Sequence, residues 1–296
     1  MKVLVFGGSG LVGSRFVKLS SQTFEIKSPS AEEVDILNRD QVAKICEEFD
    51  PDTIINFAAY TQVENAEAQK GDKNGICYLI NAIGAKNVAE VCRQYNKHLI
   101  HISTEYIFDG TKTDSPYKET DRPNPINWYG ATKFYGEDFV LKSGCLSTVV
   151  RISMPYSSYY GEKKDIARFF LENLKAANTI KAIGDQKITP TLIDDIVRAL
   201  KVLINIKSSG IYHVCVNGYT SPYEFAKLLA HDFHLDHSPI VAIPFEEYTK
   251  NKQAKILKYS WLNPAKFIKE FGEGILHTIE ENVQEFKQAV DGYSLN

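Results

Sequence analysis

The sequence predicts an α/β protein with a doubly wound parallel sheet and a smaller α/β lobe. Short apolar, β-branched runs alternate with longer helical patterns, a glycine-rich loop joins the first expected strand to the first helix, and prolines interrupt the pattern after Met154. Strands that are apolar on both faces are typical of parallel sheets covered by helices. The 296 residues suffice for one large domain or for two smaller domains that share a cleft.

The expected strands are short runs rich in apolar and β-branched residues, and helical patterns separate most of them. We expect strands at residues 3–6, 24–26, 53–57, 99–102, 148–152 and 211–216. We expect helices at residues 11–19, 41–48, 82–95, 129–141 and 193–204. After Met154 the elements become shorter and less regular, which indicates a second lobe. The strand at 211–216 is expected to rejoin the first sheet, so that the lobes interleave in sequence.

The charge and composition exclude several classes of protein. The net charge of −3 provides no basic field to hold a phosphate backbone, so we expect no nucleic-acid partner. No apolar stretch approaches the ~18 residues of a membrane span, and no basic-then-apolar leader precedes the first strand, so we expect a soluble, unexported protein. Five scattered cysteines without a CxxC pair indicate reduced core thiols and a cytoplasmic location.

One histidine cluster has the composition of a metal site. His231, His234 and His237 recur at three-residue spacing, with Asp232 and Asp236 between them. The cluster lies just before a proline, at an expected helix end, where such residues are ordinarily solvated. We therefore expect no metal site.

The glycine-rich loop, GGSGLVG, supplies Gly7, Gly10 and Gly13 between the first expected strand and helix. In a dinucleotide-binding loop one glycine turns the chain, one lets the backbone approach pyrophosphate, and one lets the helix pack on the strand. Free N–H groups at the helix N-terminus then face the phosphates. The loop therefore predicts a Rossmann-type sheet that binds a dinucleotide, and its GxxGxxG spacing points to the short-chain dehydrogenases.

The residues after the second expected strand bear on the choice of dinucleotide. An acidic residue there would bind the ribose 2′-hydroxyl of NAD, but this chain has Lys27 and Ser28. Together with Arg15 near the loop, Lys27 favours the 2′-phosphate of NADP(H). An equally consistent interpretation makes both cations ordinary solvated charges, so NAD(H) remains an alternative.

The stretch WYGATKFYGED, residues 128–138, contains two tyrosines, one of which is placed for chemistry. Tyr129 and Lys133 are four residues apart, which stacks them on one face of a helix. Tyr135 has no lysine one turn away and is interpreted as packing. A phenol with a pKa of about 10 becomes an effective acid–base group when a cation stabilises its phenolate.

Two hydroxyl residues, Ser103 and Thr104, follow the fourth expected strand. Ligands of open α/β sheets bind at the carboxyl edge, where these side chains lie. A glycine loop, a hydroxyl at a strand end and a Tyr-Lys helix occur in the order that a short-chain dehydrogenase/reductase requires.

Taken together, the motifs resemble the extended short-chain dehydrogenases/reductases, and within them the dTDP-4-dehydrorhamnose reductase family. The matching stretches cover about three quarters of the chain: GGSGLVG, VDILN, PDTIINFAAYTQVENAE, LIHISTEYIFDG, YKETDRPNPINWYGATKFYGE, DQKITPTLIDDI and GIYHVCVNGYTSPYEFA. STEYIFDG and the proline-rich approach to YGATK are specific to this branch.

The resemblance implies an NAD(P)-binding Rossmann domain at residues 1–155 and a mainly substrate-binding lobe at 156–296. It implies reduction of a nucleotide-linked 4-keto-6-deoxysugar, as in dTDP-rhamnose biosynthesis, with Thr104, Tyr129 and Lys133 as the catalytic set. It also implies a cofactor-binding set from the glycine loop and the segments after the second and third strands. That set is Gly7, Gly10, Leu11, Val12, Gly13, Asp35, Ile36, Ala58, Ala59 and Tyr60, together with Tyr129 and Lys133.

Two stretches depart from the family pattern. Where the family carries Ser-Trp-Val-Tyr, this chain has SMPY at 153–156, which removes an aromatic ring from the expected substrate pocket. Near the C-terminus Ile256 and Leu257 replace an Arg-Pro pair, and with it a guanidinium suited to a diphosphate. Lys255 and Lys258 are candidate substitutes that act as point charges.

A second function stays open beside the reductase. The chain also resembles the regulatory β subunit of methionine adenosyltransferase, which shares this fold, and this resemblance implies a cofactor-bound regulatory subunit. Retention of Thr104, Tyr129 and Lys133 favours the enzyme. The sequence gives no indication of the oligomeric state.

Overall fold

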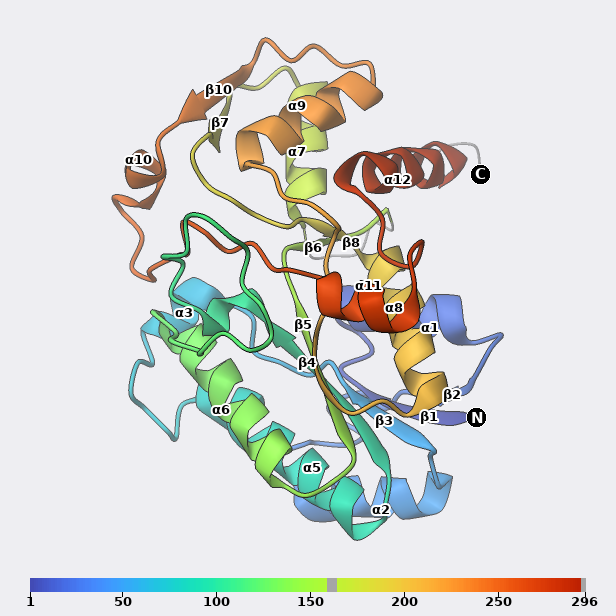
Figure 1. The fold of residues 1–296 in the computed structure, drawn as a ribbon. Coiled ribbons are helices and arrows are strands. Elements are labelled where there is room, and N and C mark those ends of the chain that lie inside the picture. The colour runs from blue at the N-terminus through green and yellow to red at the C-terminus, as the bar shows by residue number, and fades with distance from the viewer. Residues whose placement is uncertain (159–163, 294–296) are drawn as a thin grey trace.

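The computed structural model describes residues 1–158 and 164–293, and its centre is a six-stranded sheet (Figure 1). The strand order is β2-β1-β3-β4-β5-β9, and neighbouring strands pair in parallel. The strands are β1 (Lys2–Phe6), β2 (Glu25–Lys27), β3 (Thr53–Asn56), β4 (His98–Thr104), β5 (Ser147–Ile152) and β9 (Gly210–His213). The reversal of order between β1 and β3 is where an open α/β sheet leaves a crevice for a ligand.

Helices cover both faces of this sheet because alternate residues of its strands point in opposite directions. Val3 and Val5 of β1 join a core cluster with helices α1, α8 and α11, whereas Leu4 and Phe6 join a cluster with α2, α5 and α6. The first set of helices is α1 (Leu11–Ser20), α8 (Ile193–Ile206) and α11 (Ala265–Phe271). The second set is α2 (Arg39–Phe49), α5 (Ala85–Gln94) and α6 (Trp128–Lys142). Burial on both faces explains why the strands are apolar throughout.

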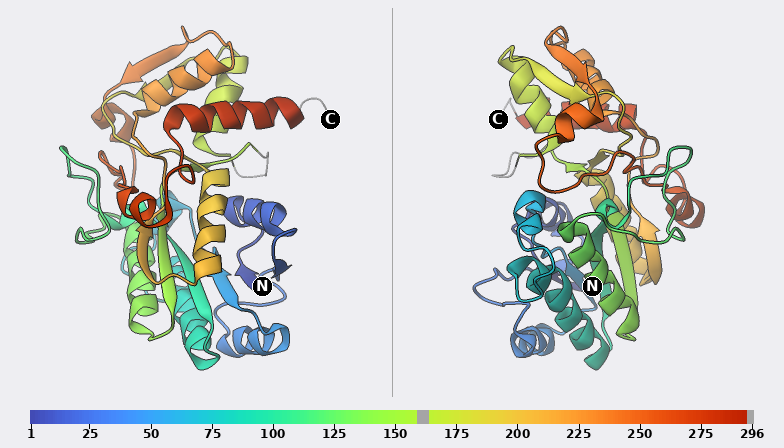
Figure 2. Two further views of the ribbon diagram at one scale, coloured as in Figure 1. Left: turned by 45° about the vertical axis from the view of Figure 1, so that its right-hand side comes forward. Right: turned by 90° about the vertical axis from the view of Figure 1, so that its left-hand side faces the viewer.

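A second lobe lies above the carboxyl edge of the sheet (Figures 1 and 2). It contains two two-stranded parallel sheets, β7 (Ile180–Ile183) with β10 (Ile240–Ile243) and β6 (Pro155–Tyr156) with β8 (Thr191–Leu192). Its core is rich in aromatic rings and is formed with helices α7 (Ile166–Lys175), α9 (Pro222–Asp232) and α12 (Ile279–Tyr293). The short helix α10 (Phe245–Thr249) follows β10.

Short helical segments connect β3 to α5 and β4 to α6. They are α3 (Val63–Glu67), α4 (Ile76–Tyr78), the π-helix η1 (Leu79–Gly84) and the 3-10 turn η2 (Glu105–Ile107). The expected helix at 82–95 therefore begins inside a π-helix that continues directly into α5.

The predicted fold class, a doubly wound parallel sheet with a smaller α/β lobe, is confirmed. The expected strand at 211–216 corresponds to β9, whose Ile211 pairs with Val149 of β5. Three elements that follow residue 155 in the chain, α8, β9 and α11, pack on the large sheet. The expected boundary between the cofactor domain and the substrate lobe near residue 155 therefore stays a prediction. Within the described residues, no helix combines the length and the apolar character that a membrane span needs.

Candidate active site

The glycine loop has the geometry that a pyrophosphate requires. Gly7 has φ of 76°, and a Cβ there would lie 2.4 Å from the backbone nitrogen of Ala58. A Cβ on Gly13 would lie 2.3 Å from the carbonyl oxygen of Gly7, so this glycine lets α1 pack against the loop. Gly10 precedes α1 and offers no side-chain cap, which leaves the first N–H groups of the helix for an anion. The loop thus fits a dinucleotide by shape and by donor set.

A cavity of about 410 Å³ brings the loop and the candidate catalytic side chains together. Its lining includes nine of the residues expected from the sequence: Gly7, Gly10, Leu11, Val12, Gly13, Ala59, Thr104, Tyr129 and Lys133. They come from the β1–α1 loop, the segment after β3, the end of β4 and the first turns of α6. The carboxyl edge of the sheet is therefore where these residues converge, as the strand-end argument predicts.

Tyr129 and Lys133 are both buried in the wall of this cavity. The Lys133 Nζ donates a hydrogen bond to the carbonyl oxygen of Ile102 at 2.7 Å. Burial lowers the pKa of Lys133 to about 8, while the negative charge of Glu137 opposes that shift, so the amine stays mostly charged at neutral pH. Burial, reinforced by the charge of Glu105, raises the pKa of Tyr129 above its usual value of 10.0, and a hydrogen bond with Thr104 opposes the shift. The phenol therefore keeps its proton in the free protein.

Thr104 ends β4, and its hydroxyl is already hydrogen-bonded. Its Oγ1 donates to Oε2 of Glu105 at 2.8 Å and accepts from the backbone N–H of Tyr106 at 3.3 Å. Burial raises the pKa of Glu105 to about 7, and hydrogen bonds from Thr104 and the backbone oppose the shift. The ring of Tyr106 stands edge-on to that of Tyr129, with centroids 5.6 Å apart.

Local interactions fix where α6 begins and so where Tyr129 points. Asn127 caps the helix by accepting the N–H of Gly130 at 2.8 Å, and its Nδ2 donates to the carbonyl oxygen of Lys255 at 2.7 Å. Glu67 of α3 accepts the N–H of Trp128 at 2.8 Å. A Cβ on Gly130 would lie 2.0 Å from the Tyr106 carbonyl oxygen, so glycine allows α6 to approach η2 closely.

Asn81 of η1 connects α6 to the segment after β3. Its Nδ2 donates to the hydroxyl of Thr132 at 2.9 Å and to the carbonyl oxygen of Tyr60 at 3.1 Å. Its Oδ1 accepts the N–H of Tyr60 at 2.8 Å. Thr132 in turn donates to the carbonyl oxygen of Tyr129 at 2.8 Å.

Four expected cofactor residues do not line the cavity. Asp35 is exposed and accepts the N–H of Leu37, and Ile36 is buried and packs against Gly84 of η1. The backbone of Ala58 packs against the glycine loop, and Tyr60 is held through its backbone by Asn81, as described above. Their contact with the adenosine half of a dinucleotide stays a prediction.

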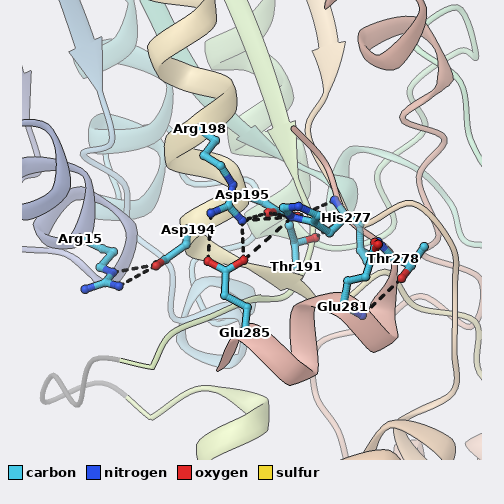
Figure 3. A network of polar contacts seen from close by, with 10 residues as sticks. Arg15, Thr191, Asp194, Asp195, Arg198, His277, Thr278, Glu281 and Glu285 are labelled. Carbon is cyan, nitrogen blue, oxygen red and sulfur yellow. Dashed lines mark hydrogen bonds and ion pairs between the residues drawn. The ribbon is translucent and has the colours of Figure 1, made fainter. Parts of the chain in front are cut away.

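The expectation that Arg15 faces a 2′-phosphate is wrong. Arg15 is buried, and its guanidinium binds Asp194 of α8 through two hydrogen bonds of 2.7 and 2.6 Å (Figure 3). It joins α1 to α8 on the face of the sheet that both helices cover. Lys27, at the end of β2, has its Nζ 5.8 Å from the centre of the Phe49 ring, and Ser28 lies against Gly8 of the glycine loop.

One group in the described residues has the composition of a metal site, namely Asp195, His277 and Glu285. Figure 3 shows the Arg198 guanidinium among them. It donates to Asp195, to Glu285 at 2.8 Å and toward His277 Nδ1 at 3.1 Å. The positively charged guanidinium of Arg198 therefore already lies where a metal ion would bind these three side chains.

A second cavity of about 530 Å³ adjoins the first, and both are lined by Val63, Tyr106 and Met154. The second lobe supplies most of the remaining lining, including the half-exposed ring of Phe169 and two lysines, Lys181 and Lys252.

The lysines of this lobe differ from the candidates taken from the sequence. Lys258 is paired with Asp185 at 2.7 Å and with Glu246 at 2.9 Å, so it is not available as a point charge for a diphosphate. Lys255 is not among the lining residues, whereas Lys252 and Lys181 are.

Sequence reasoning missed Glu105 and Asn81. Glu105 follows Thr104 directly at the strand end, which is a signal that could have drawn attention to it. Asn81 has no such signal, since its contacts with Tyr60 and Thr132 span 21 and 51 residues.

The sheet order, the glycine loop and the Thr-Tyr-Lys cavity define the extended short-chain dehydrogenase/reductase class of α/β protein. A family model described as "RmlD substrate binding domain" matches residues 1–291. A dTDP-4-dehydrorhamnose reductase of Aggregatibacter actinomycetemcomitans is 32% identical over 233 residues, 76% of each chain. The Bacillus subtilis spore coat polysaccharide biosynthesis protein SpsK is 32% identical over 251 residues, covering 83% of this chain and 84% of that protein.

Solved structures agree with this relationship. A dTDP-4-dehydrorhamnose reductase from Clostridium acetobutylicum superposes with a TM-score of 0.89 at 30% identity, covering 98% of this chain and 100% of that one. The Bacillus anthracis enzyme of the same name, in complex with NADP, has a TM-score of 0.88 at 30% identity and covers 97% of this chain and 98% of its own. The chain belongs to the dTDP-4-dehydrorhamnose reductase family.

Proposed function

We propose that the protein reduces the C4 ketone of a nucleotide-linked 4-keto-6-deoxysugar with NADPH, as the names of its relatives suggest. The observation that carries the proposal is the cavity that joins the glycine loop to Thr104, Tyr129 and Lys133. NAD(H) remains a second possible cofactor. The dinucleotide, when bound, supplies the hydride.

The chain's own residues bind the cofactor, orient the substrate and protonate the substrate oxygen. Tyr129 donates its proton to the oxygen that becomes an alkoxide, which its raised pKa permits because the proton is still present at neutral pH. Lys133 places a positive charge in the wall of the same cavity and would bind the nicotinamide ribose. Thr104 hydrogen-bonds the same substrate oxygen. The N-terminus of α1 holds the pyrophosphate.

The adjoining cavity is proposed to hold the nucleotide end of the substrate. Phe169 and Tyr248 offer rings for a base. Lys181 and Lys252 offer positive charge for a diphosphate, and each has a carboxylate partner in the free protein, Glu247 at 3.2 Å and Glu64 at 3.8 Å, that the diphosphate would displace. On this proposal the second lobe, within residues 156–296, mainly binds the substrate, and the large sheet, mostly within residues 1–155, binds the cofactor. Four buried cysteines and one partly exposed cysteine, all free, support a cytoplasmic location.

The test is NADPH oxidation measured with a panel of 4-keto-6-deoxysugar nucleotides. We expect turnover with at least one of them, and we expect dTDP-4-dehydrorhamnose to be the first candidate. Tight NADP binding without turnover on any sugar would instead favour the regulatory-subunit alternative. No relative reported above carries a regulatory name, and the retained Thr104, Tyr129 and Lys133 support the enzyme.

A further inference from the structure

Glu105 is a buried acid that the proposed chemistry does not use. It is only 4% exposed, it follows Thr104 at the end of β4, and it lines the same cavity as Tyr129. Its Oε2 accepts the Thr104 hydroxyl at 2.8 Å. Within residues 1–158 and 164–293, no lysine or arginine forms an ion pair with it.

The surroundings of Glu105 favour its neutral form. Tyr129 faces it from α6, Tyr106 from η2 itself, Cys215 from the segment after β9, and Ser153 from the segment after β5. None of these groups is positively charged. A carboxyl taken out of water without a cation tends to keep its proton, and burial raises the pKa of Glu105 to about 7.

We propose that Glu105 is a positioning residue whose proton decides the direction of the Thr104 hydroxyl. When Glu105 is ionised it can only accept, so the Thr104 hydrogen points at the carboxylate and away from the cavity. When Glu105 is protonated it donates to Thr104 Oγ1, and the Thr104 hydrogen is free to bind the substrate oxygen. This inference rests on the proposed function.

The same proton also removes a repulsion. An ionised carboxylate would stand beside the oxygen that becomes negatively charged during reduction, where a like charge opposes the reaction. Glu105 keeps its proton throughout the cycle, because the proton taken up by the alkoxide comes from Tyr129. Glu105 therefore orients the Thr104 hydroxyl and keeps its own proton during the reaction.

The test compares the pH dependence of kcat in the wild type, Glu105→Gln and Glu105→Leu. The glutamine is neutral at every pH and carries a permanent N–H donor, so it should remove the wild-type decline in kcat as pH rises through about 7. The leucine has no donor and should reduce kcat about tenfold across the range, as expected for one lost hydrogen bond. Any decline caused by Lys133 should remain in both variants, since its pKa of about 8 belongs to another group.

A matched control is Glu90→Gln, which neutralises a partly exposed carboxylate on α5, outside the cavity. Its pH profile should equal that of the wild type. Identical profiles in wild type and Glu105→Gln would overturn the inference while leaving the reductase proposal intact.

A second readout does not depend on activity. Infrared difference spectra of the wild type should show a carboxylic C=O band that titrates near pH 7 and is absent in Glu105→Gln. If no sugar nucleotide is reduced but this band titrates, the proposed function fails and the protonation of Glu105 stands. If the band is missing between pH 5 and 8, the inference is overturned.

Discussion

At the scale of single residues, burial sets the charge of the candidate site. Lys133 has a pKa of about 8 and stays mostly protonated at neutral pH, whereas Tyr129 keeps its proton because burial raises its pKa. The cavity thus offers a cation and a neutral acid where a negative oxygen develops. The expected lowering of the Tyr129 pKa by Lys133 is not seen in the free protein, because the lysine amine is bound to the Ile102 carbonyl and desolvation dominates.

Replacing Tyr129 with phenylalanine should abolish most turnover. The change removes only the proton donor, and positioned acid catalysis is typically worth ~10² to 10⁴ in rate. NADPH affinity should stay nearly unchanged, because the glycine-loop backbone holds the pyrophosphate. Steady-state kinetics and cofactor titration measure the two effects. Tyr135→Phe, on the same helix but partly exposed, serves as the control and should retain full activity. Unchanged turnover in Tyr129→Phe would contradict the assignment.

Replacing Lys27 with alanine should weaken NADPH binding about tenfold and leave NADH binding nearly unchanged. The reason is that only the 2′-phosphate gives this cation a charge-assisted hydrogen bond, worth roughly 1.5 to 3 kcal/mol. Arg15 no longer belongs in this test, since Asp194 binds its guanidinium. Fluorescence titration with both cofactors measures the effect. Lys18→Ala, in the last turn of α1, is the control. Equal affinity of the wild type for NADH and NADPH would withdraw the prediction.

The sequence predicts site residues best where local spacing defines them. Tyr129 and Lys133 line one cavity because four residues make about one helical turn, and Thr104 joins them because strand ends meet at one edge of the sheet. Arg15 was misassigned because its partner, Asp194, lies 179 residues away in the chain. No local pattern reports a contact of that kind.

At the scale of elements, α6 is positioned by neighbours that approach its backbone closely. Residues Leu79–Gly84 form the π-helix η1, which is packed on α6. A Cβ on Gly136 of α6 would lie 2.2 Å from the Asn81 carbonyl oxygen of η1. The expected helix at 82–95 was right in type, but a π-helix has no distinct sequence period and so was not foreseen. The strands of the second lobe, β6, β7, β8 and β10, were also missed; β6 and β8 have only two residues each, and β7 and β10 only four.

Replacing Gly136 with alanine should therefore destabilise the protein, by roughly 1 to 3 kcal/mol as is typical of overpacking. The added methyl group would meet a backbone carbonyl, which cannot move aside as a flexible side chain does. Urea unfolding measures the change. Gly292→Ala, also in a helix but with nothing within 4 Å of its Cβ, is the matched control. The control should be neutral or stabilising by up to about 1 kcal/mol, because alanine is the better helix former. Equal effects of both substitutions would argue against close packing of α6 on η1.

At the scale of the whole molecule, helix α8 returns to the large sheet after the second lobe has begun, and its polar side chains connect the two lobes. Asp195 and Arg198 belong to α8, whose apolar side chains pack on the large sheet, whereas Glu285 belongs to α12 of the second lobe. Figure 3 shows the three residues in one network with His277. The alternation of strands and helices was enough to predict the fold class, because it repeats along the chain. This network was not predictable, since it joins residues about 80 positions apart through contacts that leave no periodic signal.

The protein should lose stability as the pH falls from 6.5 toward 4, because buried histidines are neutral in the folded state. Burial lowers the pKa of His98 to about 4 and that of His213 to about 3, from an ordinary value of 6.5. In this window the unfolded chain takes up protons that the folded protein does not, so acid favours unfolding, by roughly 3 kcal/mol for each histidine. Glu105 acts with the opposite sign, since its raised pKa makes the folded state bind the extra proton between pH 4.5 and about 7.

Urea unfolding midpoints at pH 7.5, 6 and 5 test this balance, in which buried histidines oppose Glu105. His98 contacts the hydroxyls of Thr53 and Thr148 at 3.3 and 3.1 Å, so His98→Gln keeps a polar side chain there but removes the titration. This variant should show a smaller loss of stability between pH 7.5 and 5 than the wild type. His237→Gln, at an exposed position, should keep the wild-type dependence. The same acid sensitivity in His98→Gln as in the wild type would show that protonation of His98 does not drive the loss.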